Sequence, residues 1–325
     1  MSEIYLVFVV FLFVLAVFDL MVGVSNDAVN FLNSAIGAKV AKFRTIIIVA
    51  AVGVFMGATM SNGMMEVARN GVFHPAMFSL KELMFIFLAV MISDVILLDI
   101  FNNLGLPTST TVSLVFELLG GTTAFVLLKL ANDTTGLTVG DLMNTEKALG
   151  MIMAIFVSVA IAFFFGIVLQ YISRLVFTFT YKKNLKWKIG IFGGVATTAI
   201  FYFMLFKGIK SMSFVTPEIY EYIQNHTLGI LGICFLASTA IMQFLYFLKV
   251  NVFKILVLMG TFALAMAFAG NDLVNFIGVP LAGYSAYTDF AASGASDPST
   301  FMMSSLEGPA KSPMIFLVAA GAGGV

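Results

Sequence analysis

The chain has 325 residues, of which 60% are hydrophobic and 10% are charged. Soluble proteins average about 45–50% apolar and about 25% charged residues, so this composition indicates a membrane protein that crosses the bilayer several times. Seventeen basic and 17 acidic residues give no net charge, which leaves a nucleic-acid partner without electrostatic support. A single cysteine excludes a disulfide within the chain. Neither a nucleophile–base pair nor a metal cluster is visible, so we do not expect an enzyme.

Apolar runs of about the 20 residues that a membrane-spanning helix needs recur along the chain. The predicted spans are, in order, 4–22, 45–60, 83–100, 112–130, 148–171, 189–206, 227–248 and 252–268. The predicted loops are 131–147, 208–225 and 283–298. Basic residues concentrate at 39–44, 174–188 and 249–254, and the positive-inside rule places these segments in the cytoplasm. We therefore expect a multi-pass protein of the cell membrane, surrounded by lipids.

A short polar sequence occurs twice, each time after a long apolar run. The first copy is Asn26-Asp27-Ala28-Val29-Asn30-Phe31, and the second is Asn271-Asp272-Leu273-Val274-Asn275-Phe276. An aspartate at the centre of a membrane helix costs about 2.5–3.5 kcal/mol on insertion scales, so such a residue is a functional candidate. Duplicated interrupted helices are the best sequence pointer to the binding site of a secondary transporter. We predict that each copy breaks its helix and that both copies line one site.

The order of the spans predicts two halves of opposite topology, if 101–111 is a re-entrant segment. The first repeat would cover 1–180, with an Asn-Asp motif and a Ser-Thr-Thr hairpin, and a basic loop with linking spans would cover 181–250. The second, inverted repeat would begin in 251–325. Symmetry predicts another Ser-Thr-Thr segment beyond Val325, so we expect the second repeat to be incomplete. Either the sequence is truncated or its second half is abbreviated.

The residue types suggest how such a site could work. The segment Pro107-Thr108-Ser109-Thr110-Thr111 precedes an apolar helix and predicts a helix N-terminus with a hydroxyl cap, which offers backbone N–H groups to an anion. The same residues also fit an ordinary N-cap. Asp27 and Asp272 would repel an anion unless a proton or a cation such as Na⁺ neutralised them. Asn30 and Asn275 follow one turn later on the same helix face, where their amides could donate to the anion or accept from the metal. Alternatively, these polar groups only hold helices together.

The two Asn-Asp motifs, the Pro-Thr-Ser-Thr-Thr segment and the stretch Glu66-Val67-Ala68-Arg69-Asn70-Gly71 together resemble the inorganic phosphate transporter (PiT) family. The resemblance covers most of the chain. It implies an all-α polytopic membrane protein with inverted-topology repeats, broken helices and a re-entrant hairpin. It also implies symport of phosphate with Na⁺ or H⁺, and Glu66 matches a family glutamate implicated in transport. This chain has Val24-Ser25 where the family usually has Gly-Ala, so the resemblance does not establish close backbone packing there.

Residues and resemblance together predict a symporter that moves inorganic phosphate with Na⁺ or, failing that, H⁺, without another cofactor. Asp27 and Asp272 would bind Na⁺. The predicted substrate-binding residues are Asn26, Asn30, Ser109, Thr110, Thr111, Asn271 and Asn275. One alternative keeps transport but changes the substrate to another oxyanion such as sulfate, because hydroxyl and N–H donors distinguish tetrahedral anions poorly. Another is a non-transporting membrane scaffold. The sequence is compatible with a homo-oligomer.

Overall fold

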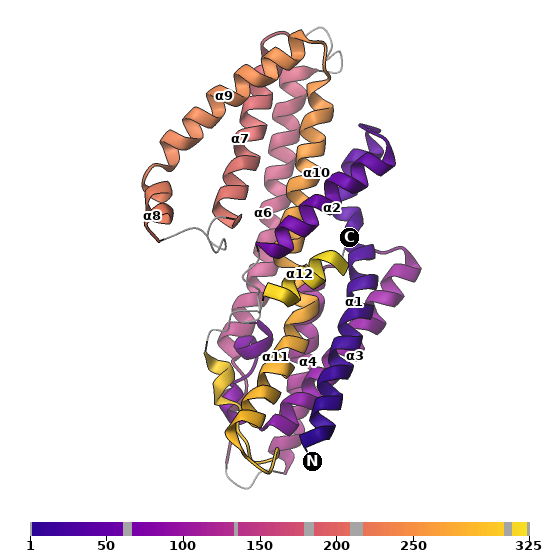
Figure 1. The fold of residues 1–325 in the computed structure, drawn as a ribbon, viewed down its shortest axis with the longest axis vertical. Helices are drawn as coiled ribbons and strands as arrows, with labels where there is room; N and C mark the ends of the chain where they lie inside the picture. Colours follow the sequence, from indigo (N-terminus) through magenta and orange to yellow (C-terminus); the bar gives the residue numbers. More distant parts are fainter. Residues whose placement is uncertain are drawn as a thin grey trace. The chain divides into compact units, whose positions relative to one another are not determined.

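The computed structural model describes residues 2–60, 67–132, 136–178, 185–208, 217–308 and 314–323. Each regular element within these ranges is a helix (Figure 1), as expected for the all-α class. The α-helices are α1 (Ser2–Gly37), α2 (Phe43–Thr59), α3 (Leu80–Leu104), α4 (Thr110–Ala131), α5 (Val139–Leu142), α6 (Thr145–Phe177), α7 (Lys188–Gly208), α8 (Pro217–Asn225), α9 (Thr227–Phe247), α10 (Val252–Asn271), α11 (Leu273–Ser293) and α12 (Met314–Gly323). The shorter elements are the π-helix η1 (Val67–Gly71) and the 3₁₀-helices η2 (Pro75–Met77) and η5 (Ser304–Glu307).

Six helical segments of the described residues are long and apolar enough to cross a membrane. They are Glu3–Gly37, Leu80–Leu104, Thr110–Ala131, Thr145–Phe177, Thr227–Phe247 and Val252–Ser293. Two shorter apolar helical segments, Phe43–Thr59 and Lys188–Met204, cover most of the predicted spans 45–60 and 189–206. The prediction of a multi-pass membrane protein is therefore confirmed, while the inverted relation between its halves stays a prediction.

The chain forms two compact units, and neither unit is continuous in sequence. The first unit contains Met1–Val29, Ser61–Ile155 and Phe268–Val325. The second unit contains Asn30–Met60 and Phe156–Ala267. Asp27 and Asp272 both belong to the first unit, although they lie near opposite ends of the sequence. The boundaries at residues 180 and 250 that the sequence suggested for repeats are not tested by this division.

The core of the first unit is built mainly from α1, α3, α4 and α11. Gly283 in α11 allows these helices to approach closely, since a Cβ there would lie 2.7 Å from Leu12 of α1 and 3.6 Å from Phe87 of α3. The prediction of a loop over 283–298 is wrong for its first part, because α11 continues to Ser293. Small residues of that stretch pack into the core, and membrane helices tolerate an internal proline such as Pro280.

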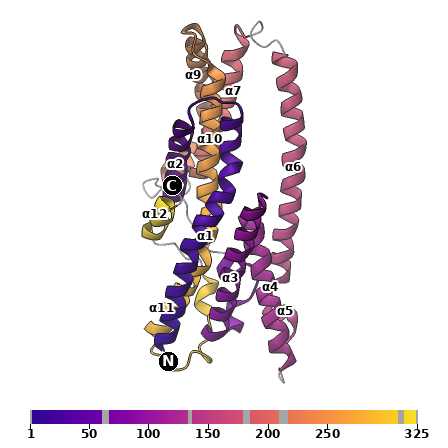
Figure 2. The ribbon, with the colours of Figure 1, turned by 90° about the vertical axis from the view of Figure 1, so that its right-hand side faces the viewer.

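Helices α3 and α4 form a hairpin within the first unit and lie side by side in both ribbon views (Figures 1 and 2). Ser79 caps α3 through a reciprocal capping box with Glu82. Gly105 ends α3 with a φ of 66°, a left-handed conformation that glycine adopts without steric cost. The turn after Gly105 leads through residues 107–111, which we call the hydroxyl segment, into α4. This turn therefore determines where the hydroxyl segment lies.

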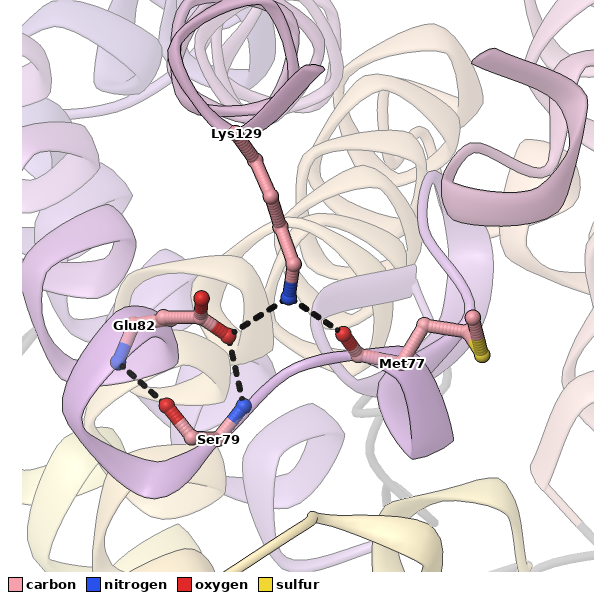
Figure 3. Close-up of polar contacts among 4 residues, drawn as sticks. All are labelled: Met77, Ser79, Glu82 and Lys129. Atoms are coloured by element: carbon pink, nitrogen blue, oxygen red, sulfur yellow. Dashed lines mark hydrogen bonds and ion pairs between the residues drawn. The ribbon is translucent and has the colours of Figure 1, made fainter. Parts of the chain in front are cut away.

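The other end of the hairpin is joined by an ion pair (Figure 3). Lys129 in the last turn of α4 donates to Glu82 of α3 at 3.0 Å and to the backbone oxygen of Met77 at 2.8 Å. The same Glu82 oxygen accepts from the Ser79 backbone N–H at 2.8 Å. Lys129 and Glu82 are each 22% exposed, and exposed ion pairs contribute about 0.2–1 kcal/mol. This contact therefore helps to fix the register of α3 and α4 at the end remote from the turn.

The second unit is held by glycine-mediated contacts between helices. A Cβ at Gly53 of α2 would lie 2.6 Å from the backbone oxygen of Phe262 in α10, and a Cβ at Gly57 would overlap the backbone of Met266. Glycines 190, 193 and 194 of α7 similarly allow α9 to approach. Close packing at small residues is the usual way in which membrane helices associate.

Two loops predicted from polar composition contain short helices. The segment 208–225 includes α8, which begins at Pro217, and proline is favoured in the first helical turn because its missing N–H has no intrahelical partner there. The segment 131–147 includes α5, where the backbone N–H and the hydroxyl of Thr138 both donate to Asp141. These two hydrogen bonds hold the pKa of the exposed Asp141 carboxyl below its usual value. The loop predictions were therefore wrong at these helical segments.

Candidate functional site

The first Asn-Asp motif lies inside an unbroken helix. Helix α1 runs from Ser2 to Gly37 through Asn26 and Asp27, so the predicted break at this copy is wrong. Serine rather than glycine stands immediately before this copy, and serine costs about 0.5 kcal/mol less than glycine within a helix. The side chain of Asn26 also bonds to a distant segment instead of competing for the backbone of its own helix.

Asn26 holds the α3–α4 turn against α1. Its amide nitrogen donates to the side-chain oxygen of Asn102 at 3.2 Å and to the backbone oxygen of Leu106 at 3.0 Å. Its side-chain oxygen accepts from the backbone N–H of Thr108 at 2.9 Å. Asn102 in turn donates to the backbone oxygen of Val22 at 2.9 Å. These bonds engage both ends of the Asn26 amide with protein groups, which makes Asn26 a positioning residue for the hydroxyl segment.

The hydroxyl segment forms the N-terminus of α4, as the sequence predicted. Ser109 is the N-cap, and its hydroxyl accepts from the backbone N–H of Val112 at 3.4 Å. Thr110 is 2% exposed and opens the helix, while Thr111 is half-buried. The cap prediction is thus confirmed. Ser109 itself is exposed, so its hydroxyl is accessible as well as capping.

The second Asn-Asp motif does interrupt its helix. Helix α10 ends at Asn271, α11 begins at Leu273, and Asp272 lies between them. The interruption is confined to this one residue, because Asp272 keeps helical dihedral angles (φ −90°, ψ −38°) and its backbone N–H still donates to the oxygen of Phe268 at 2.7 Å. Gly270 immediately before the motif explains the difference from the first copy, because glycine lowers helix propensity by about 1 kcal/mol relative to alanine.

Thr111 connects the hydroxyl segment to the second motif. Its hydroxyl donates to an Asp272 carboxylate oxygen at 2.7 Å and accepts from the amide of Asn275 at 2.9 Å. Asn275 is 5% exposed, so this three-residue bridge lies largely inside the first unit. Three of the predicted site residues, drawn from opposite ends of the sequence, therefore meet in one hydrogen-bonded group.

The two aspartates of the motifs are close enough to repel each other electrostatically. Asp27 is 3% exposed and Asp272 is half-buried. Near them α1 and α11 approach closely, because a Cβ on Gly23 would overlap the ring of Phe276, the final residue of the second motif. Phe276 is 1% exposed and fills this contact. The structure thus places Asp27 of the first copy near Asp272 of the second, while a single site lined by both copies stays a prediction.

Three predicted site residues are not part of this group. Asn30 is exposed and belongs to the second unit. Asn271 ends α10, but its side chain lies outside the described side chains, and Glu66 lies outside the described residues. Sequence reasoning did not identify Asn102, which contacts Asn26. The sequence feature that could have identified Asn102 is the polar pair Asn102-Asn103 at the end of an apolar run. The same pair is equally typical of a helix end that faces solvent.

Within the described part of the chain, no group of three or more histidine, cysteine, aspartate or glutamate residues could hold a metal ion. A cation between Asp27 and Asp272 would therefore need other oxygen ligands. The hydroxyl oxygen of Thr111 lies 2.7 Å from Asp272, and the side-chain amide of Asn275 contacts that hydroxyl. Such neutral oxygens suit a hard cation of low charge, which has no need of an all-carboxylate cage.

Comparison with known proteins adds two findings to this geometry. The sequence model of the phosphate transporter family matches residues 23–323. A solved structure described as "The sodium-dependent phosphate transporter" is similar, with a TM-score of 0.68 and 20% sequence identity. The alignment covers 98% of this chain and 74% of that chain, and at this identity the likeness concerns the fold. A search of curated proteins gave no match.

Proposed function

The chain belongs to the phosphate transporter family, and we propose that it is a symporter that carries inorganic phosphate across the membrane together with Na⁺. The observation that carries this proposal is the Thr111 bridge, in which a helix N-terminus meets Asp272 and Asn275 of the second motif. An anion site and a cation site would then share one residue. Such sharing gives the two ligands a direct way to alter each other's affinity.

Phosphate would bind at the N-terminus of α4. The first backbone N–H groups of a helix lack intrahelical partners, and the helix dipole there favours a negative charge. The hydroxyls of Ser109, Thr110 and Thr111 and the amide of Asn275 would add donors to phosphate oxygens. Asn26 supports this arrangement because it fixes the turn that leads into α4. Membrane proteins use interrupted helices with exposed ends in the same way to bind ions at mid-membrane depth.

Na⁺ would bind between Asp27 and Asp272. Two nearby carboxylates repel each other and also repel phosphate, so the site becomes favourable to an anion only after a cation has entered. Each ligand then raises the affinity for the other by the same factor, which is thermodynamic coupling. Thr111 lies between the proposed anion and cation sites, because its hydroxyl donates to the Asp272 carboxylate. A cation bound to that carboxylate would replace the hydroxyl hydrogen, and the hydroxyl could then turn toward phosphate.

Uptake of radiolabelled phosphate into proteoliposomes tests the proposal. We expect uptake driven by an inward Na⁺ gradient and abolished when choline replaces Na⁺ on both sides. Equal uptake in both conditions would overturn sodium coupling, and a proton gradient would then be tested as the driving force. Competition by an excess of unlabelled sulfate tests the substrate class: unchanged uptake would show selectivity for phosphate, and strong competition would show that the substrate class is broader.

The predicted roles of Asn30, Asn271 and Glu66 are tested in the same assay. We expect Asn30→Ala and Asn271→Ala to raise the phosphate concentration needed for half-maximal uptake, because each removes an amide donor. Glu66→Gln should lower the maximal rate. Glu146→Gln is a suitable control, since Glu146 is an exposed acid at the start of α6. Equal effects of the control and of these variants would remove the three residues from the site.

A further inference from the structure

A second group of acids lies in the membrane-spanning part of the first unit, outside the Asn-Asp motifs. Asp19 of α1 is 0% exposed and Asp94 of α3 is 3% exposed. Glu117 of α4 is half-buried, and Ser113 lies one turn before it on the same helix. Asp19 interacts with both Asp94 and Glu117. Three acids from three different helices therefore share one buried region.

The contacts of Ser113 require a proton on one of these acids. Its hydroxyl oxygen lies 2.7 Å from an oxygen of Asp94 and 2.8 Å from an oxygen of Glu117. Both distances are those of full O–H···O hydrogen bonds. A serine hydroxyl has only one hydrogen to donate. The second bond therefore needs a hydrogen from the carboxyl group itself, which can donate only when it is protonated.

Asp19 gives independent support for a ligand in this region. Within the described part of the chain, no N–H or hydroxyl group donates to either of its carboxylate oxygens or to the second oxygen of Glu117. The carboxyl group of Asp94 lies within hydrogen-bonding reach of both acids, but it can donate only when it is protonated. Buried polar groups of proteins nearly always have a partner, and an ionised carboxylate without one is far less favourable still. A group that supplies a hydrogen to these oxygens is needed.

Among the described residues, no lysine or arginine forms an ion pair with any of the three acids, and the buried Arg69 of η1 donates instead to Ser285 and to the backbone oxygen of Ser305. Helices α1 and α11 contain no lysine, arginine or histidine. Lys81 and Lys129 lie near the ends of α3 and α4, and Lys129 bonds to Glu82. On the side of the motifs, Asp27 interacts electrostatically with Asp94 of the cluster and with Asp272, and both motif residues are also acidic.

A proton supplies directly the hydrogen that these oxygens lack. Protons bind to single oxygens and can be shared between carboxyl groups that lie close together. Acids inside membrane spans that pair with one another often form proton relays.

We propose that Asp19, Asp94 and Glu117 form a proton-binding site, separate from the two Asn-Asp motifs, in which Ser113 links Asp94 to Glu117. At neutral pH the site holds at least one exchangeable proton as a carboxylic acid. Release of this proton leaves neighbouring negative charges that repel one another and move α1, α3 and α4 apart at this depth. The inference concerns these three helices alone and holds whether or not phosphate is the substrate.

Infrared spectroscopy of the full chain in lipid nanodiscs, free of Na⁺ and phosphate, tests the proposal without any transport step. Ordinary aspartates and glutamates have pKa values of about 4 and are ionised at about pH 7. A carbonyl band of a protonated carboxylic acid at that pH, with the shift in D₂O of an exchangeable proton, is therefore the expected signal. Raising the pH should abolish the band reversibly.

Variants assign the band. Asp94→Asn and Glu117→Gln should each remove most of it, while Asp99→Asn, an exposed acid on the same helix as Asp94, should leave it unchanged. Ser113→Ala should shift its frequency because the acid loses its hydrogen-bond partner, and this milder variant serves if the others do not fold.

The absence of a band at about pH 7, where free carboxyl groups are ionised, would overturn the proposal. So would a band that survives Asp19→Asn, Asp94→Asn and Glu117→Gln alike. A band that disappears only in Asp27→Asn would mean that the proton belongs to the motif instead. None of these results depends on phosphate uptake, so failure here and failure of the proposed function are distinguishable.

Discussion

The two copies of the motif Asn-Asp-x-Val-Asn-Phe have nearly the same sequence but different local structures. In the first copy α1 continues through the motif, and Asn26 holds the turn before α4. In the second copy the helix is interrupted, and Asp272 and Asn275 bond directly to Thr111. One copy thus positions the hydroxyl segment, and the other forms a hydrogen bond with it through a carboxylate. A short motif therefore supplies the polar groups, while its flanks and partners decide how they are used.

The largest expected effect comes from Asp272, the acid that contacts the hydroxyl segment. Asp272→Asn removes a charge-assisted hydrogen bond to Thr111, and such bonds contribute about 1.5–3 kcal/mol. We expect Na⁺-driven phosphate uptake in proteoliposomes to fall by about 10–100-fold, since about 1.4 kcal/mol corresponds to a factor of ten. Asp27→Asn should also reduce uptake and should weaken its dependence on Na⁺ concentration.

Asp99→Asn is the control for these two variants, because Asp99 is exposed on α3 and bonds to Asn103 of its own helix. It should transport like the unaltered protein. Undiminished uptake by Asp272→Asn would contradict the view that the second copy acts through its carboxylate. It would favour a role in helix packing alone.

The close approach of α1 and α11 is the next feature to test. Gly23→Ala would place a methyl group against the buried ring of Phe276, and overpacking of this kind costs about 1–3 kcal/mol. Thermal unfolding in nanodiscs should show the loss of stability. Gly37→Ala, on the same helix, meets no atom within 4 Å and should be neutral or slightly stabilising. Equal unfolding of the two variants would mean that the two motifs do not depend on this contact.

Thr111 can be tested with little change in shape. Thr111→Val removes the hydroxyl that lies between Asp272 and Asn275, and a typical hydrogen bond contributes about 0.5–1.5 kcal/mol. Uptake should therefore fall by about 3–10-fold, with normal folding. The matched control is Thr123→Val, because the Thr123 hydroxyl bonds to Leu119 within the same helix. A comparable loss in both variants would point to a general effect on α4.

Sequence patterns predicted those features that depend on composition and local chemistry. Apolar runs located the long helices, and the serine before an apolar run located the cap of α4. Features that depend on tertiary partners were missed. The role of Asn102 arises from a bond between residues 76 positions apart. Burial of the small residues around Gly283 likewise converted a predicted loop into helix, which no local pattern signalled.

The smallest expected effect concerns the residue before each motif. Ser25→Gly gives the first copy the flank of the second, and glycine costs about 0.5 kcal/mol more than serine within a helix. Amide hydrogen exchange at residues 26–30 should become slightly faster, while the reverse change, Gly270→Ser, should slow exchange at residues 272–276. Ser34→Gly is the control, because Ser34 is exposed on α1 beyond the motif. If Ser34→Gly accelerates exchange at residues 26–30 as much as Ser25→Gly does, the flank does not keep the first copy helical. The bonds from Asn26 to Leu106 and Thr108 would then be the main cause, because they act on the motif from outside its own helix.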